Sequence, residues 1–310
     1  MRTFEYVVKI AEERSLLRAA KKLYISSSAL SQSVSKLEAD LRTPLFVRSK
    51  NGWYPTAAGE IYIDMAKNIL DLQRRAYTEI SLVSGSFASN ITMGVSAGHM
   101  TEMFSDIFPI FNTRFPNIKI TLTGSVVFDI ISQLKEQQID LGFIASAFAI
   151  PDLRTYPLSS ERFLIVVPRN HPLSRAKGAR IPAFSKVPIE RFRDCEFILS
   201  SEGTTIRLAE NEIFKRAGFT PKTIFETSNI RTIYNLAASG YAISILPSSY
   251  AAPTNEAVYF YLDTAVRWNR FAATNAKHHL TIPEQYLISL AKDWAIDKDR
   301  KNYAHQDVIE

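Results

Sequence analysis

The sequence lacks several features that mark large classes of proteins. Its 310 residues include one cysteine, Cys195, so no disulfide can form within the chain. No window approaches the roughly eighteen uninterrupted apolar residues of a membrane-spanning helix. The N-terminus carries charges throughout and has no apolar core of the kind found in signal peptides. We therefore expect a cytoplasmic protein that has no membrane partner.

Residue patterns for metal binding and catalysis are also missing. No pair among the five histidines has the spacing that places two ligands on one helical face, and no cysteine cluster accompanies them. The chain has no phosphate-binding loop, no dinucleotide glycine fingerprint and no nucleophile–base constellation. We predict no catalytic residue, no metal site and no cofactor, and hence no enzyme. An α/β enzyme with an appended helical domain and a pure solute-binding module are the alternatives.

Positive charge is concentrated at the N-terminus. The composition is 46% hydrophobic and 22% charged, which is enough apolar material for folded cores. Residues 1–58 contain ten Lys/Arg and five Asp/Glu, whereas the net charge of the whole chain is only +6. A basic segment on a nearly neutral body indicates an anionic partner for that segment. A solvated basic surface without a partner remains open on charge alone.

The first forty residues predict three short helices. In the first and third, apolar residues recur three or four positions apart: Phe4, Val7, Val8 and Ala11, then Leu30, Val34, Leu37 and Leu41. Between them, Ser15 can cap a helix over residues 16–23, and Ser26 can cap the third helix. Two helices joined by a short turn indicate a helix-turn-helix.

The third helix is unusual because its outward face is rich in serine. Residues 25–38 contain six serines, which could indicate a linker, but a linker would not keep the apolar stripe in register. Small hydroxyl side chains at the start of a recognition helix can approach bases and phosphates in the major groove. On this helix and the one before it, the predicted DNA contacts are Arg18, Ser27, Ser28, Ala29, Ser31, Gln32, Ser35 and Lys36.

A basic hairpin is predicted directly after these helices. The segment LFVRSKNGWYPT holds two short extended pieces around Asn51-Gly52, a pair that favours a tight turn. Arg48 and Lys50 lie on it, and both are predicted to contact DNA as parts of a wing along the phosphate backbone. An ordinary hairpin without a DNA role is the alternative.

Over the first sixty residues the chain resembles the LysR-type transcriptional regulators. The motif residues stand at the family's separations: Ser15-Leu16, Ala19-Ala20, Ala29-Leu30-Ser31, Leu37-Glu38, Leu45-Phe46, Arg48, Thr56 and Gly59. Two positions depart from the family pattern. Ser27-Ser28 replaces a common Gln-Pro pair, which puts the transfer of base contacts in doubt, and Arg14 replaces a common glycine.

A long helix is predicted to follow the hairpin. From Thr56, a natural N-cap, about 28 residues run without proline, and their apolar residues recur three and four apart: Ile61, Met65, Ile69, Leu72, Ala76, Ile80 and Val83. Two copies of such a helix could bury this stripe against each other. The resemblance implies the same role, a linker helix that dimerises. Residues 85–90, GSFASN, are predicted to form the hinge after it.

The remaining chain alternates strand and helix patterns, which predicts parallel sheets covered on both faces. Two such units indicate two α/β lobes with a cleft between them, and the family's effector domain, which resembles periplasmic solute-binding proteins, has this form. The predicted fold is thus multi-domain α+β: a winged helix-turn-helix (1–58), a linker helix and hinge (59–90) and a periplasmic-binding-protein-like effector domain (91–296). We place lobe I at about 91–162 and 268–296, and lobe II at about 163–267. A polar tail (297–310) is expected to be disordered.

Four loops after predicted strands are candidate effector contacts, because ligands of doubly wound sheets bind there against helix N-termini. The residues named are Ser96, Ala97, Gly98, His99, Met100, Ser125, Val126, Val127, Ser201, Thr204, Thr205, Thr227 and Asn229. Free N–H groups and hydroxyls would suit a small carboxylate. Simple helix capping is the alternative for each loop, and His99 could equally be an ordinary surface histidine.

These observations predict a DNA-binding transcriptional regulator that responds to a small-molecule effector in the interlobe cleft. The expected partners are double-stranded DNA, the effector and further copies of the chain in a homodimer or homotetramer. RNA polymerase is a further candidate partner.

Overall fold

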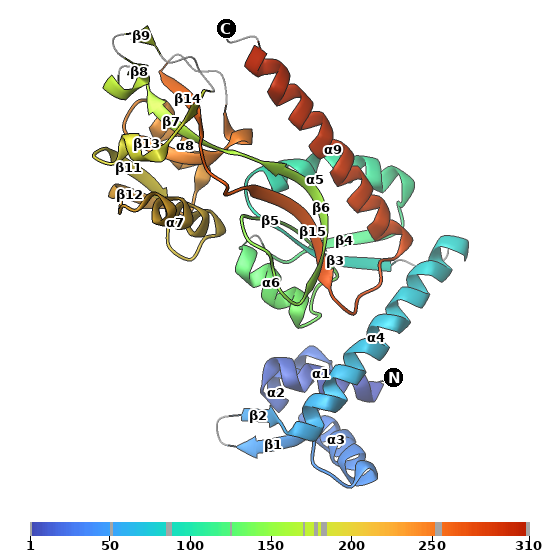
Figure 1. Ribbon diagram of the computed structural model, residues 1–310. Coiled ribbons are helices and arrows are strands. Elements are labelled where there is room, and N and C mark those ends of the chain that lie inside the picture. The colour runs from blue at the N-terminus through green and yellow to red at the C-terminus, as the bar shows by residue number, and fades with distance from the viewer. Residues whose placement is uncertain are drawn as a thin grey trace. The chain divides into compact units, whose positions relative to one another are not determined.

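The structure is a computed structural model, and it describes residues 2–49, 52–84, 89–124, 126–169, 171–176, 179–180, 185–251 and 256–307 (Figure 1). The chain divides into two compact units. Unit 1 comprises Met1–Ser89 with Lys277–Thr281, and unit 2 comprises Asn90–Ala276 with Ile282–Glu310. In the part of the chain that the structure describes, no helix is both long and apolar enough to cross a membrane. The predicted hinge at 85–90 lies largely outside the described residues.

Unit 1 contains four helices and a hairpin in its described part. They are α1 (Arg2–Glu13), α2 (Leu16–Lys22), α3 (Ser27–Leu41), β1 (Phe46–Ser49), β2 (Gly52–Pro55) and α4 (Ala57–Ser84). The side chains of Ser15 and Ser26 cap α2 and α3, where they accept hydrogen bonds from the N–H groups of Arg18 (3.4 Å) and Ala29 (3.2 Å). Thr56 Oγ1 accepts a bond from Gly59 N–H (3.0 Å) at the start of α4. These three caps are the ones that the sequence predicted.

The core of unit 1 forms where the apolar faces of the helices meet. Its fully buried members include Val7, Ile10, Ala19, Leu30, Val34, Leu45 and Ala66. Helix α4 contributes one face to this core, chiefly Ile63 and Ala66. Strands β1 and β2 pair antiparallel, with Phe46 opposite Pro55, and the Phe46 ring packs 5.8 Å from the Trp53 ring. The hairpin is thereby fixed to the helices.

One part of unit 2, here called lobe I, is built on a five-stranded sheet in the order β4-β3-β5-β15-β6. Its elements are β3 (Ser89–Val95), α5 (His99–Arg114), β4 (Ile118–Leu122), α6 (Val127–Lys135), β5 (Leu141–Ser146), β6 (Leu153–Glu161), β15 (Trp268–Asn275) and α9 (Ile282–Asp307). Helix α6 packs on β5 and β15, while α5 and α9 pack on each other (Figure 1). All six residues of β5 are buried, as expected of a strand covered on both faces.

The other part, lobe II, is built on a six-stranded sheet in the order β10-β14-β7-β13-β11-β12. Its main elements are β7 (Phe163–Pro168), β10 (Lys186–Val187), β11 (Glu196–Ser200), α7 (Thr205–Ala217), β12 (Lys222–Thr227), α8 (Ile230–Ala238), β13 (Ile243–Pro247) and β14 (Ala257–Leu262). A small ribbon of β8 (Arg175–Ala176) and β9 (Ala179–Arg180) and three 3-10 turns, η1 (Pro172–Ser174), η2 (Ile189–Phe192) and η3 (Ser248–Tyr250), complete it. The chain passes from lobe I to lobe II at Arg162 and returns between Leu262 and Trp268.

The expectation of parallel sheets holds only in part, because both sheets are mixed. Strands β3 and β5 run parallel, as do β11, β12 and β13. Strand β7 is antiparallel to both β13 and β14, and β15 is antiparallel to both β5 and β6. The antiparallel strands are those that begin or end at a crossing between lobes, where the chain enters a sheet without a preceding helical crossover.

Strands β6, β14 and β15 were not named from the sequence, nor were the two-residue strands β8, β9 and β10. Strand β6, LRTYPLSSE, contains Pro157 near its centre, and a proline inside a segment disfavours a strand assignment. It lies at the edge of its sheet and pairs only with β15, and proline is tolerated in an edge strand.

The expectation of a disordered tail was also wrong. Helix α9 continues through this segment as far as Asp307. Beyond Pro283 the helix contains neither proline nor glycine, and the residues after Ile296 include several good helix formers such as Ala, Lys and Arg.

Candidate functional site

The outward face of α3 presents a row of short polar side chains. Ser28, Gln32, Ser35 and Lys36 are exposed there, beside the partly exposed Ser27 and Ser31, and Ala29 is exposed as well. Among the described residues, the side chains of Ser27, Ser31, Gln32 and Lys36 have no hydrogen-bond partner. Ser33 differs, because its hydroxyl donates to the backbone oxygen of Ala29 (2.9 Å). The sequence-predicted contacts on α3 therefore lie together on one accessible face.

A partly buried carboxylate joins α3 to the hairpin. Glu38 accepts hydrogen bonds from the backbone N–H groups of Leu45 (2.8 Å) and Phe46 (3.1 Å), and it pairs with Arg48 (2.8 Å). The Arg48 guanidinium also donates to Ser35 Oγ (3.1 Å) and lies 4.5 Å from the centroid of the Trp53 ring. Arg48 thus fixes the hairpin against α3 while remaining partly exposed. Lys50 lies outside the described residues.

Arg18 lies on α2, exposed but not free. Its guanidinium donates to the backbone oxygen of Glu13 and lies 3.6 Å from the Glu13 carboxylate, which Lys22 contacts at 2.5 Å. The hydrogen bond from Lys22 lowers the pKa of Glu13 below its usual value. A DNA phosphate would have to compete with Glu13 for both cations.

Two glycines in unit 1 are required by close packing. At Gly52, with φ of 136°, a Cβ would lie 2.6 Å from the backbone oxygen of Arg14. At Gly59 a Cβ would lie 2.0 Å from the backbone oxygen of Leu45. Arg14, which stands where the family commonly has glycine, has φ of 49° and so adopts a left-handed conformation. The turn geometry is therefore the one that glycine favours, although the residue is arginine.

Helix α4 has an apolar stripe that unit 1 does not cover. Ile61, Met65, Leu72, Ala76 and Ile80 are exposed along it, and Ile69 is partly exposed. These are members of the stripe predicted from the sequence. An exposed row of large aliphatic side chains on a helix of 28 residues is typical of an interaction surface.

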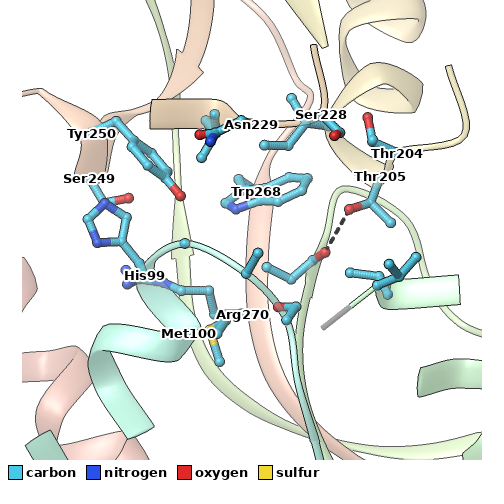
Figure 2. Close-up of a pocket in the computed structure, with 18 of the residues that line it drawn as sticks. His99, Met100, Thr204, Thr205, Ser228, Asn229, Ser249, Tyr250, Trp268 and Arg270 are labelled. Atoms are coloured by element: carbon cyan, nitrogen blue, oxygen red, sulfur yellow. Dashed lines mark hydrogen bonds between the residues drawn. The ribbon is translucent and has the colours of Figure 1, made fainter. Parts of the chain in front are cut away.

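A cavity of about 460 Å³ lies between lobe I and lobe II. Its volume is in the range of small-molecule sites. Helices α5, α6, α7 and α8 all begin at its wall. Apolar side chains such as Val127, Ile206 and Trp268 form much of its lining, and Figure 2 shows Trp268 among them. The cavity is therefore an apolar space bordered by helix N-termini.

Most of the sequence-predicted effector residues line this cavity, namely Ser96, Ala97, Gly98, His99, Met100, Val126, Val127, Thr204, Thr205 and Asn229. Ser201 and Thr227 do not line it. The N–H of Ser201 donates to the Thr227 backbone oxygen (3.1 Å), and Thr227 Oγ1 accepts from the N–H of Asn229 (3.1 Å), so both residues stabilise loops instead. Ser125 lies outside the described residues.

Sequence reasoning missed the charged and aromatic part of the lining. The missed charged and aromatic residues are Glu102, Phe128, Glu161, Arg231, Tyr250, Trp268 and Arg270, and Ala145, Ile206 and Ser249 were missed with them. Phe128 and Ile206 directly follow predicted residues on helices, and helical spacing could have indicated Glu102 and Arg231. Glu161, Trp268 and Arg270 come from β6 and β15, which were not named as strands from the sequence.

Each of the two arginines that the structure describes in the cavity lining, Arg231 and Arg270, lies beside a carboxylate of opposite charge. Arg231 on α8 pairs with Glu102 on α5 (3.2 Å), and this ion pair joins the two lobes. Arg270 lies 3.6 Å from Glu161, which also accepts bonds from Ser248 Oγ (3.2 Å), Ser249 N–H (2.6 Å) and Ser249 Oγ (3.1 Å). The lining is therefore close to neutral.

A second contact between the lobes is a hydrogen bond from a side-chain hydroxyl to a backbone oxygen. Thr205, at the start of α7, donates from Oγ1 to the backbone oxygen of Ala145 on β5 (3.1 Å), as the dashed line in Figure 2 shows. Thr204 and Asn229 are occupied as N-caps of α7 and α8. Capping and cavity lining, which sequence analysis treated as alternatives for these loops, occur together.

Within the described part of the chain, His99 lines the cavity with a ring that has a hydrogen-bond partner on one nitrogen only. Its ring lies beside the ring of Tyr250, with centroids 4.2 Å apart (Figure 2). Nδ1 lies 2.9 Å from the Glu102 carboxylate, whereas Nε2 is buried and has no partner among the described residues. Burial lowers the pKa of the imidazole, although Glu102 opposes this shift. Burial also raises the pKa of the Tyr250 hydroxyl.

Two family models match nearly the whole chain. Residues 1–60 match the bacterial regulatory helix-turn-helix protein of the lysR family, and residues 84–295 match the LysR substrate binding domain. The chain belongs to the LysR family of transcriptional regulators.

Individual relatives of this LysR-type regulator align with it over most of both chains. The HTH-type transcriptional regulator YcgK of Bacillus subtilis is 25% identical over 93% of this chain and 94% of its own length. The nitrogen assimilation regulatory protein nac of Escherichia coli is 28% identical over 81% of this chain and 79% of its own length.

Solved structures share the fold of this LysR-type regulator. Full-length OxyR from Pseudomonas aeruginosa has a TM-score of 0.65 at 24% identity, covering 94% of this chain and 93% of that one. Full-length CbnR in complex with its target DNA has a TM-score of 0.52 at 20% identity, covering 95% and 99%. The protein is thus a transcriptional regulator with a DNA-binding helix-turn-helix and an effector-binding domain, and not an enzyme.

Proposed function

We propose that the protein binds operator DNA as a homodimer or homotetramer and changes its arrangement on DNA when a small molecule occupies the interlobe cavity. Residues 1–58 form the DNA-binding domain, 59–90 the linker helix and hinge, 91–296 the effector domain and 297–310 the tail. RNA polymerase is the further protein partner through which such a regulator would act.

The observation that carries the DNA-binding part is the outward face of α3. Helix packing in unit 1 uses Leu30 and Val34, which leaves Gln32 and Lys36 exposed and without partners among the described residues. Polar groups of this kind can bond to base edges, while the basic surroundings attract phosphates. Ser27 and Ser28 replace a Gln-Pro pair that is common in the family. We therefore propose that the operator sequence of this protein differs from the operators of such family members.

The experiment compares two neighbouring substitutions on α3. Duplexes that the wild-type protein selects from a random pool serve as the operator. Gln32→Ala should weaken binding by about tenfold to a hundredfold, because a bidentate base contact is lost. Ser33→Ala is the matched control, since the Ser33 hydroxyl already bonds to the Ala29 backbone oxygen and should not contribute to binding.

Electrophoretic mobility shifts at several salt concentrations measure the affinity of each variant for the operator and the dependence of that affinity on salt. Wild-type affinity should fall steeply as salt is added, as phosphate contacts require. Unchanged affinity in the Gln32→Ala variant, or a flat salt response, would contradict the proposed DNA surface.

Support for the oligomer comes from α4, whose uncovered stripe fits pairing with a second copy of the same helix. Support for the switch comes from the contacts between lobes. Arg231–Glu102 and Thr205–Ala145 both cross the cavity region, so a ligand held there would alter the contacts that join the lobes. An effector acts only if it binds one arrangement of the protein more tightly than another.

A further inference from the structure

The feature of the cavity that best indicates the chemistry of a ligand is one hydrogen-bond acceptor, Nε2 of His99. The proton of a neutral His99 ring is placed on Nδ1, because Nδ1 faces the Glu102 carboxylate at 2.9 Å and a carboxylate can only accept. Nε2 then carries a lone pair and no proton. His99 lines the cavity, and its Nε2 is buried and without a partner among the described residues.

A second buried polar atom lies on the same loop. Ser96 is only 3% exposed, and its Oγ has no hydrogen-bond partner among the described residues. A hydroxyl can donate or accept, so it accommodates either kind of ligand atom. Leaving buried groups of this kind unpaired is costly, and a ligand that pairs them removes the cost.

The charges facing His99 leave little for a charged ligand to bind. From its own helix α5 it faces Glu102, which Arg231 of α8 neutralises; from β6 and β15 it faces the pair Glu161–Arg270; from η3 it faces the neutral Tyr250. A ligand carboxylate or ammonium would enter an almost neutral, desolvated space without an unmatched counter-charge.

The helix N-termini are satisfied as well. Thr204 and Asn229 cap α7 and α8 with their side chains. Helices α5 and α6 have no side-chain cap, but Glu102 and Asp129 lie in their first turns and supply negative charge there. The attraction of these helix ends for a further anion is therefore reduced.

We propose that the cavity binds an uncharged molecule with an apolar body and a hydrogen-bond donor, such as a primary amide or an alcohol, whose N–H or O–H donates to His99 Nε2. This inference rests on the proposed effector site and replaces the small carboxylate expected from the sequence. The apolar body packs on the walls formed by Trp268, Tyr250 and Val127. In a primary amide, the carbonyl oxygen accepts from the Ser96 hydroxyl.

The test uses three matched probes on the full-length protein, each in a benzene and a naphthalene series: the aryl amide, the methyl ketone and the carboxylate. The amide and the ketone have similar shapes, but only the amide donates, and the carboxylate differs from both in charge. Ligand-detected NMR and calorimetry should show the amide binding about tenfold more tightly than either, the value expected for one satisfied buried acceptor.

Substitutions at His99 assign the preference to this residue. His99→Phe keeps a ring and removes the acceptor, so it should bind amide and ketone equally. His99→Gln restores an acceptor oxygen and should recover part of the preference, provided that thermal unfolding shows both variants folded. Lowering the pH until His99 takes up a proton should weaken amide binding and strengthen carboxylate binding.

Tighter binding of the carboxylate would overturn the donor preference but leave the effector cavity in place. Equal binding of amide and ketone by the wild type, or a preference unaffected by His99→Phe, would also overturn it. Failure of all probes in both series would count against this inference and the proposed effector cavity together, while the DNA-binding proposal would stand on its separate test.

Discussion

At the turn between α1 and α2, Arg14 has φ of 49°, a conformation that costs an L-residue about 1–2 kcal/mol relative to glycine. Its backbone oxygen accepts a bond from the N–H of Trp53 (3.1 Å) and excludes a side chain at Gly52, so the surrounding contacts hold it in place. Its guanidinium lies 5.9 Å from the Tyr54 ring, a distant contact at the surface. The backbone of this residue is therefore strained, with little compensation from its side chain.

Arg14→Gly should raise the free energy of unfolding of unit 1 by about 0.5–1 kcal/mol, because the relief of strain exceeds the extra entropy of glycine in the unfolded chain. Hydrogen exchange of the α1 to α3 amides measures the change. Arg14→Ala removes the same side chain and keeps the strain, so it should give no gain. Equal stabilisation by both variants would show that the side chain, and not the backbone, is responsible.

Gly59 illustrates the opposite situation, in which a methyl group cannot be added. Gly59→Ala should destabilise unit 1 by about 1–3 kcal/mol, because its Cβ would meet the Leu45 backbone oxygen at 2.0 Å and neither backbone can move easily. Thermal unfolding and operator binding report the loss. Gly124→Ala is the control, since a Cβ at Gly124 meets nothing within 4 Å; comparable losses in the two variants would refute this account.

Among the elements, α7 is joined to β11 by a buried acid. Glu210 is fully buried and accepts hydrogen bonds from the N–H (3.0 Å) and Oγ (3.1 Å) of Ser200. Burial raises its pKa from 4.5 to about 8, so the carboxyl is largely protonated at neutral pH. Since Ser200 precedes the loop that leads to Thr204 and the cavity, this contact helps to position part of the lining.

The raised pKa makes the stability of unit 2 depend on pH. Between about pH 4.5 and about pH 8 the folded state holds a proton that the unfolded state has lost, so stability is greatest at low pH and falls as the pH rises. Glu210→Gln mimics the protonated form. In thermal unfolding, its stability relative to wild type should increase over this pH interval and level off above it; a constant difference would show that Glu210 does not titrate in this way.

The elements also show where prediction from sequence succeeds. Caps and helices are local, so Ser15, Ser26 and Thr56 could be placed from residues next to them. The register of β6 against β15 depends on pairing across more than a hundred residues, and only that pairing brings Arg270 to Glu161. The lining residues at the starts of helices were therefore predictable from the sequence, whereas the lining residues on β6 and β15, including the Glu161–Arg270 pair, were not.

For the whole molecule, we propose that the uncovered stripe of α4 forms the contact between copies of the chain. Leu72→Glu should convert the oligomer into smaller species, because a charge would enter an apolar contact between copies. Light scattering coupled to size exclusion measures the mass. Glu60→Gln alters an exposed residue on the opposite side of the same helix and should leave the mass unchanged. An unaltered mass in the Leu72→Glu variant would exclude the stripe as the interface.

The order of strands has a consequence for how effector recognition can diversify. All strands of the six-stranded sheet come from one uninterrupted stretch, residues 163–262, whereas the five-stranded sheet is assembled from chain on either side of it. Lobe II is thus an insertion that recombination could exchange as one cassette with two junctions. Such a chimaera would acquire new residues in place of Thr204, Asn229 and Tyr250 while retaining His99, so one side of the cavity lining can be inherited separately from the other.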